Sequence, residues 1–138
     1  MNRGKYVVFA LDGERFGLPI ERVERILPAQ SVTRIPKTSR ELLGVLALRG
    51  STLLVVDTRA LLEFEEGERG CFVAVLADDR RIALTADRVD CIANFEAKEI
   101  EFSEELGTYV GKQADRLTLL STPEEMIPQL LLERAIPA

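Results

Sequence analysis

Residues 5–18 read KYVVFALDGERFGL, and residues 71–84 read CFVAVLADDRRIAL. Each stretch has an apolar run, a turn signal at Asp12-Gly13 or Asp78-Asp79, and a second apolar run. Val, Ile, Phe and Tyr favour strands, and Asp-Gly between two apolar runs is a strong hairpin signal. The two stretches therefore predict two β-hairpins, one at the start of each half of the chain.

The similarity of the two halves extends beyond these hairpins. At an offset of 66 residues, seven of the twenty positions from 7 to 26 are identical in residues 73–92: Val7, Asp12, Arg15, Leu18, Arg22, Val23 and Ile26. Glu21 and Glu24 fall on Asp87 and Asp90, and with a contraction residues 55–58 fall on residues 119–122. An internal repeat predicts duplicated modules. We therefore expect one domain over residues 1–138, built from pseudo-repeats of about 5–66 and 71–127.

The remaining segments predict short elements. Leu42–Leu48 and Thr52–Val56 form a second hairpin in this interpretation, and residues 58–62 form a one-turn helix whose exposed amides Asp57 can cap. Residues 35–39 are a predicted loop, residues 94–109 a polar crossover, and residues 129–135 a short C-terminal helix.

The segment from Ile20 to Leu27 fits two structures. Ile20, Val23, Ile26 and Leu27 have the three- and four-residue spacing of one helical face. The stop at Pro28 leaves room for only about two turns, which is marginal for a helix. A turn at residues 20–22 leading into a strand is equally allowed.

Composition bounds the function. The chain has 138 residues, 46% of them hydrophobic and 30% charged, and such a chain buries roughly two-thirds of its unfolded surface. No apolar tract is long enough to cross a membrane, and the N-terminus lacks a signal-peptide pattern, so we expect a cytoplasmic protein with no direct membrane insertion. The net charge of −5 and a pI near 4.9 argue against nucleic acid as a partner.

The chain lacks the usual residues of catalysis and metal binding. It has no histidine, no GxGxxG or GxxxxGK[ST] spacing, and only two cysteines, Cys71 and Cys91. No cofactor or metal is therefore predicted. The apolar neighbours of both cysteines favour reduced, buried, structural side chains. The acidic pairs at 78–79 and 65–66 lie in turn-like surroundings that favour solvated charge over acid/base work.

Four segments carry a family resemblance: FGLPIERVERI at 16–26, TRIP at 33–36, GVLALRG at 44–50 and LVVDTR at 54–59. In this order and at these spacings they resemble the signature of CheW coupling proteins, and the resemblance runs from about Tyr6 to Ile127. It implies an all-β fold with short helices, in which two SH3-like five-stranded barrels share a hydrophobic seam. It also implies a scaffold without chemistry of its own.

The resemblance implies two protein partners in bacterial chemotaxis. The regulatory domain of a CheA-type histidine kinase docks onto one barrel, and the cytoplasmic tip of a chemoreceptor enters the groove between the barrels, which recruits the adaptor to receptor arrays at the membrane. Carried over by motif, Val23, Ile26 and Val32 face the receptor groove. Arg49 is the arginine of the family's leucine-arginine-glycine turn, followed by Gly50.

Each of these assignments has a structural alternative. Arg49 follows an apolar strand at a turn, where its guanidinium can bind a carboxylate, but it can equally pair with a neighbour such as Asp57. Val23, Ile26 and Val32 are more often core than interface, because isolated apolar residues usually face inward. Asp57 and Asp87 are assigned structural roles, as a helix cap and a turn residue.

Departures from the family concern the partner contacts. Ala47 stands where the family has Asn before the turn, which predicts a looser turn. The second-half hairpin is shortened at residues 111–116, and Ser121 replaces the aspartate that would match Asp57, as an adequate cap. Interface energy concentrates in few residues, so these changes affect partner choice more than fold.

Three classes of function are compared with the sequence. The coupling adaptor leads, with a divergent adaptor for another kinase pathway, such as pili or gene expression, as its variant. A ligand- or nucleic-acid-binding barrel would need a basic groove and stacking aromatics, but the chain has eight aromatics and no Trp. An enzyme with Cys71 or Cys91 as nucleophile would need a lowered thiol pKa, for which only Arg69 and Arg88 are near in sequence.

Overall fold

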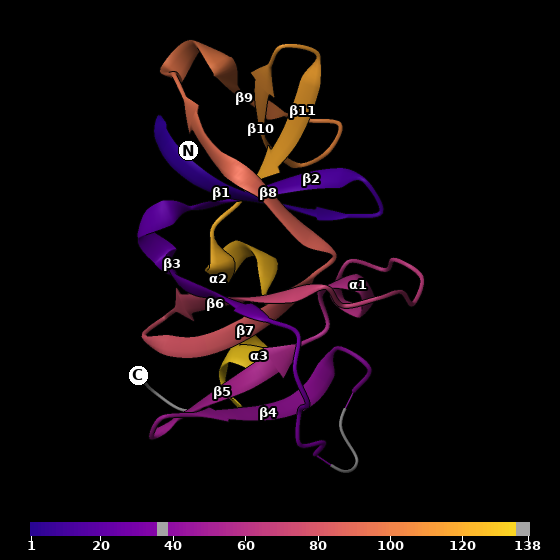
Figure 1. The fold of residues 1–138 in the computed structure, drawn as a ribbon. Coiled ribbons are helices and arrows are strands. Elements are labelled where there is room, and N and C mark those ends of the chain that lie inside the picture. Colours follow the sequence, from indigo (N-terminus) through magenta and orange to yellow (C-terminus); the bar gives the residue numbers. More distant parts are fainter. Residues whose placement is uncertain (36–38, 135–138) are drawn as a thin grey trace.

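The computed structural model describes residues 1–35 and 39–134, which form two β-sheets stacked one above the other (Figure 1). The strands are β1 (Gly4–Leu11), β2 (Glu14–Pro19), β3 (Val23–Pro28), β4 (Leu42–Leu48), β5 (Ser51–Val56), β6 (Cys71–Ala77), β7 (Arg80–Ala86), β8 (Arg88–Phe95), β9 (Ile100–Ser103), β10 (Thr108–Gln113) and β11 (Arg116–Leu120). The helices are α1 (Thr58–Leu61), α2 (Pro123–Met126) and α3 (Gln129–Leu132), with 3-10 turns η1 (Ile20–Arg22) and η2 (Ala97–Glu99).

The all-β class with short helices is confirmed, but the two closed five-stranded barrels are not. One sheet has six strands in the order β8-β1-β2-β11-β10-β9, and the other has five in the order β3-β6-β7-β5-β4. Both orders are open, with an edge strand at each end. A single bridge from Thr33 to Val45 links the segment after β3 to β4. The sixth strand, β9, comes from the predicted crossover, whose Ile100–Ser103 pairs with β10.

The two halves of the chain exchange their first hairpins, so each hairpin lies in a sheet with strands of the other half. β1 and β2 from the first half pair with β8 and β11, whereas β6 and β7 from the second half pair with β3 and β5. The pairings correspond one to one: β1–β8 and β6–β3 are antiparallel, and β2–β11 and β7–β5 are parallel. This correspondence supports two pseudo-repeats of about 5–66 and 71–127, which we propose as the organisation of the domain.

The main hydrophobic core is the predicted seam between the sheets. Buried side chains of β1 and β2, such as Phe9 and Leu18, pack with those of β6 and β7, such as Val73 and Leu84. Leu131 and Leu132 of α3 belong to the same cluster. Each fully buried side chain of this size contributes roughly 1.5–3 kcal/mol. One smaller cluster is formed by side chains of the five-stranded sheet and another by side chains of the six-stranded sheet.

The ambiguous segment folds as a turn and a strand. Ile20–Arg22 is one 3-10 turn, and β3 starts at Val23 with a bulge between Val23 and Arg25. The strand forms because its amides can pair with β6, which lies 48 residues further along the chain and which local spacing cannot reveal.

The short helices are close to prediction. α1 begins after Asp57, whose side chain accepts a hydrogen bond from the Arg59 amide. The cap of α2 is Thr122 and not Ser121, because Thr122 and Glu125 form a reciprocal capping box with Pro123 at the first helical position. α3 ends at Leu132, and Ala135 lies outside the described residues, as do Pro36, Lys37 and Thr38 of the predicted loop.

Candidate functional site

Val23 and Ile26 lie on β3, the edge strand nearest the seam. Val23 is half-buried and packs against the seam cluster. Ile26 pairs in register with Val73, a seam residue, but its side chain is 47% exposed. The predicted apolar pair therefore stands partly in solvent beside the core.

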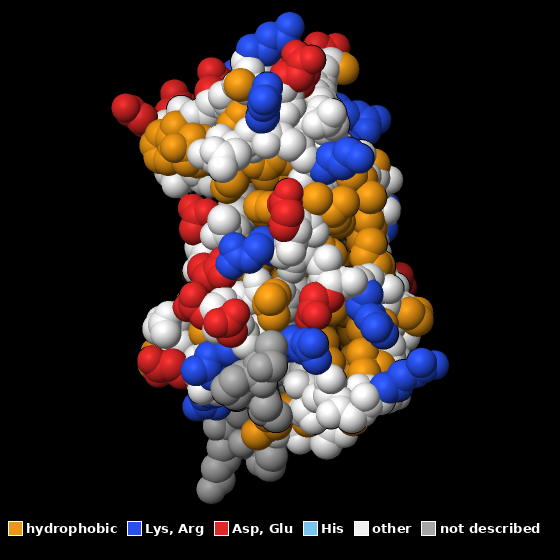
Figure 2. Space-filling model, turned by 90° about the vertical axis from the view of Figure 1, so that its left-hand side faces the viewer, with side chains coloured by type: hydrophobic (Ala, Val, Ile, Leu, Met, Phe, Trp, Pro, Cys, Tyr) orange, Lys and Arg blue, Asp and Glu red, His pale blue; other side chains and the backbone are white. Residues whose placement is uncertain are grey.

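The second half places an equivalent pair on β8, an edge strand of the six-stranded sheet. Val89 also packs against the seam cluster, and Ile92 is 58% exposed. The 66-residue offset relates Val23 to Val89 and Ile26 to Ile92, so the repeat contained the signal for this pair. We call these four side chains the waist surface. Figure 2 shows hydrophobic side chains exposed at the waist between the two sheets.

Val32 does not join the waist surface. It lies in the segment between β3 and β4, half-buried against the cluster inside the five-stranded sheet. There it lines a shallow cavity with Leu43 and Phe72. The Thr33–Val45 bridge joins this segment to β4, which lies at the opposite edge of the five-stranded sheet from β3.

Arg49 occupies a two-residue turn between β4 and β5. Leu48 pairs with Ser51, and the central residues Arg49 and Gly50 have φ of 36° and 82°. Turns with two positive φ values match the twist of a hairpin and favour Asn, Asp or Gly. Gly50 suits its position, whereas arginine is an unusual residue at the first.

The Arg49 side chain is exposed and lines a cavity of about 200 Å³ together with Arg25, Arg81 and Glu24. Arg25 follows the bulge on β3 and precedes Ile26 directly. Successive side chains of a strand point to opposite faces. The structure therefore joins Val23 with Ile26 on one face of β3 and Arg49 with Arg25 on the other.

Asp57 does not pair with Arg49. Its Oδ1 caps α1, and its Oδ2 accepts from Arg69 at 3.1 Å. Its side chain is 9% exposed, as expected for a structural carboxylate.

Asp87 lies in the bend between β7 and β8, but it is more than a turn residue. Its oxygens accept from Arg59 Nε at 3.0 Å and Nη2 at 2.7 Å, and from the Asp12 amide at 2.9 Å. Burial raises the pKa of Asp87, but these hydrogen bonds outweigh burial and hold the pKa below its ordinary value. Sequence analysis missed Arg59, because no local pattern shows which carboxylates it meets.

The two cysteines differ from each other. Cys71 is half-buried, and burial raises the pKa of its thiol, which opposes thiolate chemistry. Cys91 is exposed on β8, so the prediction that both are buried was wrong for Cys91. β8 is an edge strand, so Cys91 has a neighbouring strand on one side alone. Within residues 1–35 and 39–134, no group of three His, Cys, Asp or Glu side chains is arranged to hold a metal ion.

A family model for the CheW-like domain matches residues 5–120, most of the chain. The chain belongs to the CheW-like domain family. Among curated proteins, the CheW chemotaxis proteins of Helicobacter pylori and Klebsiella aerogenes are 26% and 25% identical to it; each match covers 89% of this chain and 81% of the relative. The Bacillus subtilis CheW protein is 26% identical over 73% of this chain and 67% of its own length.

The CheW-like fold is also found in a solved structure. The scaffolding protein TtCheW from Thermoanaerobacter tengcongensis superposes with a TM-score of 0.79 at 23% identity, over 86% of this chain and 88% of that one. The likeness shows a common fold. In the described part of this CheW-like chain, every helix is too short or too polar to span a bilayer.

Proposed function

We propose that this protein is a non-catalytic adaptor that couples chemoreceptors to a CheA-type histidine kinase in cytoplasmic chemotaxis signalling. Membership of the CheW-like family supports the coupling role. The observation that carries the receptor contact is the waist surface, where two isoleucines from opposite halves of the chain stand 47% and 58% exposed beside the seam.

The waist surface suits an amphipathic helix. Val23 and Val89 each pack against the seam cluster, and Ile26 and Ile92 are exposed on β3 and β8, an edge strand of each sheet. An apolar helix face that covers such a surface removes it from water, at roughly 25 cal/mol per Å² of apolar area. We assign Val23 and Ile26, together with Val89 and Ile92, to the chemoreceptor tip.

The other two predicted receptor residues have different places in this proposal. Arg49 lies on the far face of β3 and supplies a polar contact outside the waist surface. Val32 holds the segment after β3 against the five-stranded sheet and thereby positions its neighbours.

The kinase contact requires another surface. Phe102 and Leu106 at the outer end of the six-stranded sheet are 53% and 55% exposed, and Phe102 packs edge-on against Tyr109 at 5.1 Å between ring centroids. Aromatic side chains often anchor protein interfaces. We assign this end to the regulatory domain of the kinase.

Calorimetric titration tests the proposal. The purified protein should bind the CheA regulatory domain of the same organism with micromolar affinity, about −8 kcal/mol, and an unrelated SH3-like barrel should give no heat of binding. A protein that shows saturable binding to neither the kinase domain nor the receptor tip would contradict the coupling role.

Two variants separate the surfaces. Ile26→Ser and Ile92→Ser should each weaken receptor-tip binding about tenfold and leave kinase binding unchanged. Leu130→Ser is the matched control, because Leu130 is 77% exposed on α3 and belongs to neither of the two assigned surfaces. Equal losses in all three variants would mean that the waist surface is not a specific contact.

A further inference from the structure

The cavity beneath the β4–β5 turn has an unbalanced charge. Three arginines, Arg25, Arg49 and Arg81, line it with a single acidic residue, Glu24. Two arginines are thus in excess, in a chain whose net charge is −5. We call this site the arginine cavity.

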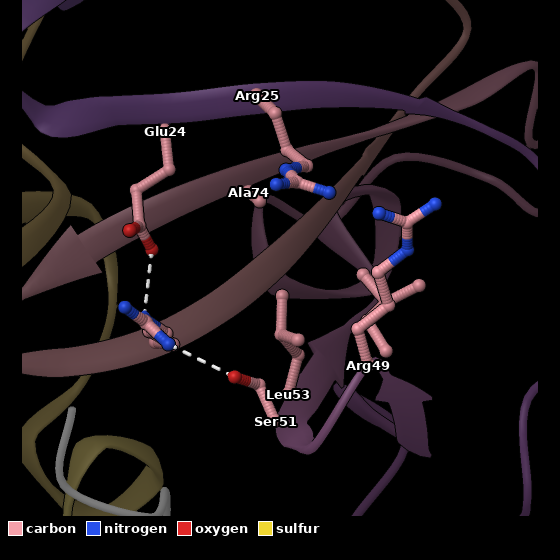
Figure 3. Close-up of a pocket in the computed structure, with 8 residues that line it drawn as sticks. Glu24, Arg25, Arg49, Ser51, Leu53 and Ala74 are labelled. Carbon is pink, nitrogen blue, oxygen red and sulfur yellow. Dashed lines mark hydrogen bonds and ion pairs between the residues drawn. The ribbon is translucent and has the colours of Figure 1, made fainter.

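Among the residues that the structure describes, only the guanidinium group of Arg81 has side-chain partners. Arg81 Nε lies 3.2 Å from Glu24 Oε1, and its Nη1 donates to Ser51 Oγ at 3.0 Å. The side chains of Arg25 and Arg49 form neither a hydrogen bond nor an ion pair with any residue that the structure describes. In Figure 3 the Arg25 side chain extends from β3 and the Arg49 side chain from the β4–β5 turn, and both enter the same pocket.

The repeat shows that the pairing of Arg81 with Glu24 recurs in the second half, whereas Arg25 has no arginine counterpart there. At the offset of 66, Arg81 corresponds to Arg15 and Glu24 to Asp90, and these residues also pair, Arg15 Nη1 to Asp90 Oδ2 at 3.8 Å. The arginine–carboxylate pair is therefore a shared structural feature of both halves. The counterpart of Arg25 is Cys91, and the corresponding cavity of the second half contains two further arginines of its own, Arg88 and Arg116, of which Arg88 pairs with Asp90.

The backbone conformation of the turn also gives no reason for an arginine at position 49. A residue with a side chain at φ of 36° is held in the left-handed region, at a cost of roughly 1–2 kcal/mol. Turn chemistry alone favours Asn or Gly at this position. Arg25 adds a second positive charge to the same cavity, and the one carboxylate of the lining, Glu24, pairs with Arg81.

From this geometry we infer that Arg25 and Arg49 together bind one carboxylate, supplied by an acidic side chain of a protein partner. Two planar guanidinium groups offer parallel N–H donors to the two oxygens of a carboxylate. A cavity of about 200 Å³ with Leu53 and Ala74 at its base admits an Asp or Glu side chain. The inference deepens the proposed adaptor function by naming the chemistry of the Arg49 contact.

A partner-independent experiment tests the site itself. Sodium glutarate, a soluble dicarboxylate, is titrated into the ¹⁵N-labelled protein while the arginine Nε–H signals are followed by NMR. The signals of Arg25 and Arg49 should shift with one shared, saturable dissociation constant, whereas that of the exposed Arg3 should not saturate. Arg25→Gln should weaken the effect on Arg49 at least tenfold. Shifts at Arg25 and Arg49 no larger than at Arg3 would overturn the inference.

Partner binding is then measured by calorimetry with Arg25→Gln, Arg49→Asn, the double variant and the control Arg3→Gln. Asn suits the positive φ, so Arg49→Asn preserves the turn. We expect each single variant to weaken receptor-tip binding about tenfold and to leave kinase binding unchanged. The double variant should be little worse than either single one, because both arginines hold one carboxylate. A loss of receptor-tip binding below twofold would refute a receptor carboxylate, even if glutarate binds.

Failure of the adaptor function gives a different result. A wild-type protein that binds neither partner would reject the coupling role, while the glutarate titration would still decide whether the arginine cavity takes a carboxylate.

Discussion

Arg59 shows how one side chain can join three parts of the chain. Its Nε and Nη2 bind both oxygens of Asp87, Nη2 also lies 2.7 Å from Asp12 Oδ1, and Nη1 donates to the Glu65 carbonyl. Asp12 lies in the β1–β2 turn of one sheet, and Asp87 closes β7 of the other. Hydrogen bonds to Asp87 and Asp12 raise the pKa of Arg59, so the guanidinium stays charged.

We predict that Arg59→Gln lowers the free energy of unfolding by about 2–4 kcal/mol, because it leaves two carboxylates near a 9% exposed site without their cation. Urea denaturation measures the change. Arg88→Gln is the control: Arg88 pairs with Asp90, but its side chain is 58% exposed, so its loss should cost less than about 1 kcal/mol. Equal effects of the two variants would contradict a special role for Arg59.

The lowered pKa of Asp87 predicts how stability depends on pH. A carboxyl whose folded pKa lies below its unfolded value contributes stability above the unfolded pKa, ordinarily 3.8, and that contribution is lost as the pH falls through the folded pKa. At pH 7, Asp87→Asn should therefore be about 2 kcal/mol less stable than the wild type. The difference should shrink steadily below about pH 4. A difference independent of pH down to 2.5 would show that Asp87 does not act through its charge.

At the scale of elements, the hairpin turns show a common geometry with different residues. The central residues of the β1–β2 turn, Asp12 and Gly13, have φ of 51° and 79°, and those of the β6–β7 turn, Asp78 and Asp79, have φ of 48° and 58°. A glycine adopts the second position freely, whereas a side chain there is strained. The backbone conformation of the β6–β7 turn is therefore less favourable than that of the β1–β2 turn.

Asp79→Gly should raise the free energy of unfolding by about 0.5 kcal/mol, since relief of the left-handed strain exceeds the extra entropy of glycine in the unfolded chain. The reciprocal change Gly13→Asp should lower it by a similar amount, because a Cβ at Gly13 meets no atom within 4 Å and only the backbone responds. Chemical denaturation of both variants measures these shifts. Changes of the same sign in both would show that contacts, and not backbone conformation, decide these turns.

At the scale of the whole molecule, the exchanged hairpins make the two sheets interdependent. Neither half can complete its sheet alone, because β1–β2 pairs with strands of the second half and β6–β7 with strands of the first. The seam adds side chains from both sheets to one cluster. Polar contacts of α1 and α2 are similar in the two halves. Arg59 of α1 binds the carboxylates of Asp87 and Asp12. Glu124 of α2 binds the Arg22 side chain and the Asp78 amide, so an acidic side chain takes the place of the arginine.

We therefore predict a single cooperative unfolding transition. Tyr6 and Tyr109 both lie in the six-stranded sheet, so tyrosine fluorescence reports on that sheet, whereas far-UV circular dichroism reports on both. The urea midpoints from the two probes should coincide. In native-state hydrogen exchange, the slowest amides of β1 and β6 should show the same opening free energy. A lower midpoint for one sheet would mean that the halves fold separately.

The sequence by itself determined the local features of this protein. The hairpins at 5–18 and 71–84, the cap at Asp57 and the 66-residue repeat depend on neighbours in the chain and on alternation, which the sequence displays directly. The absence of histidine and the acidic balance likewise bounded the chemistry.

Only the tertiary structure decided which strands became edges and which charges met. Ile92 and Cys91 are exposed because β8 lies at the end of its sheet, and Ile26 because β3 lies at the end of the other. Arg49 shares a cavity with Arg25, whereas Asp57 lies at the other end of β5 and pairs with Arg69. The physical reason is the same in each case: alternation shows which side chains share a face of a strand, but burial and ion pairing depend on partners far along the chain.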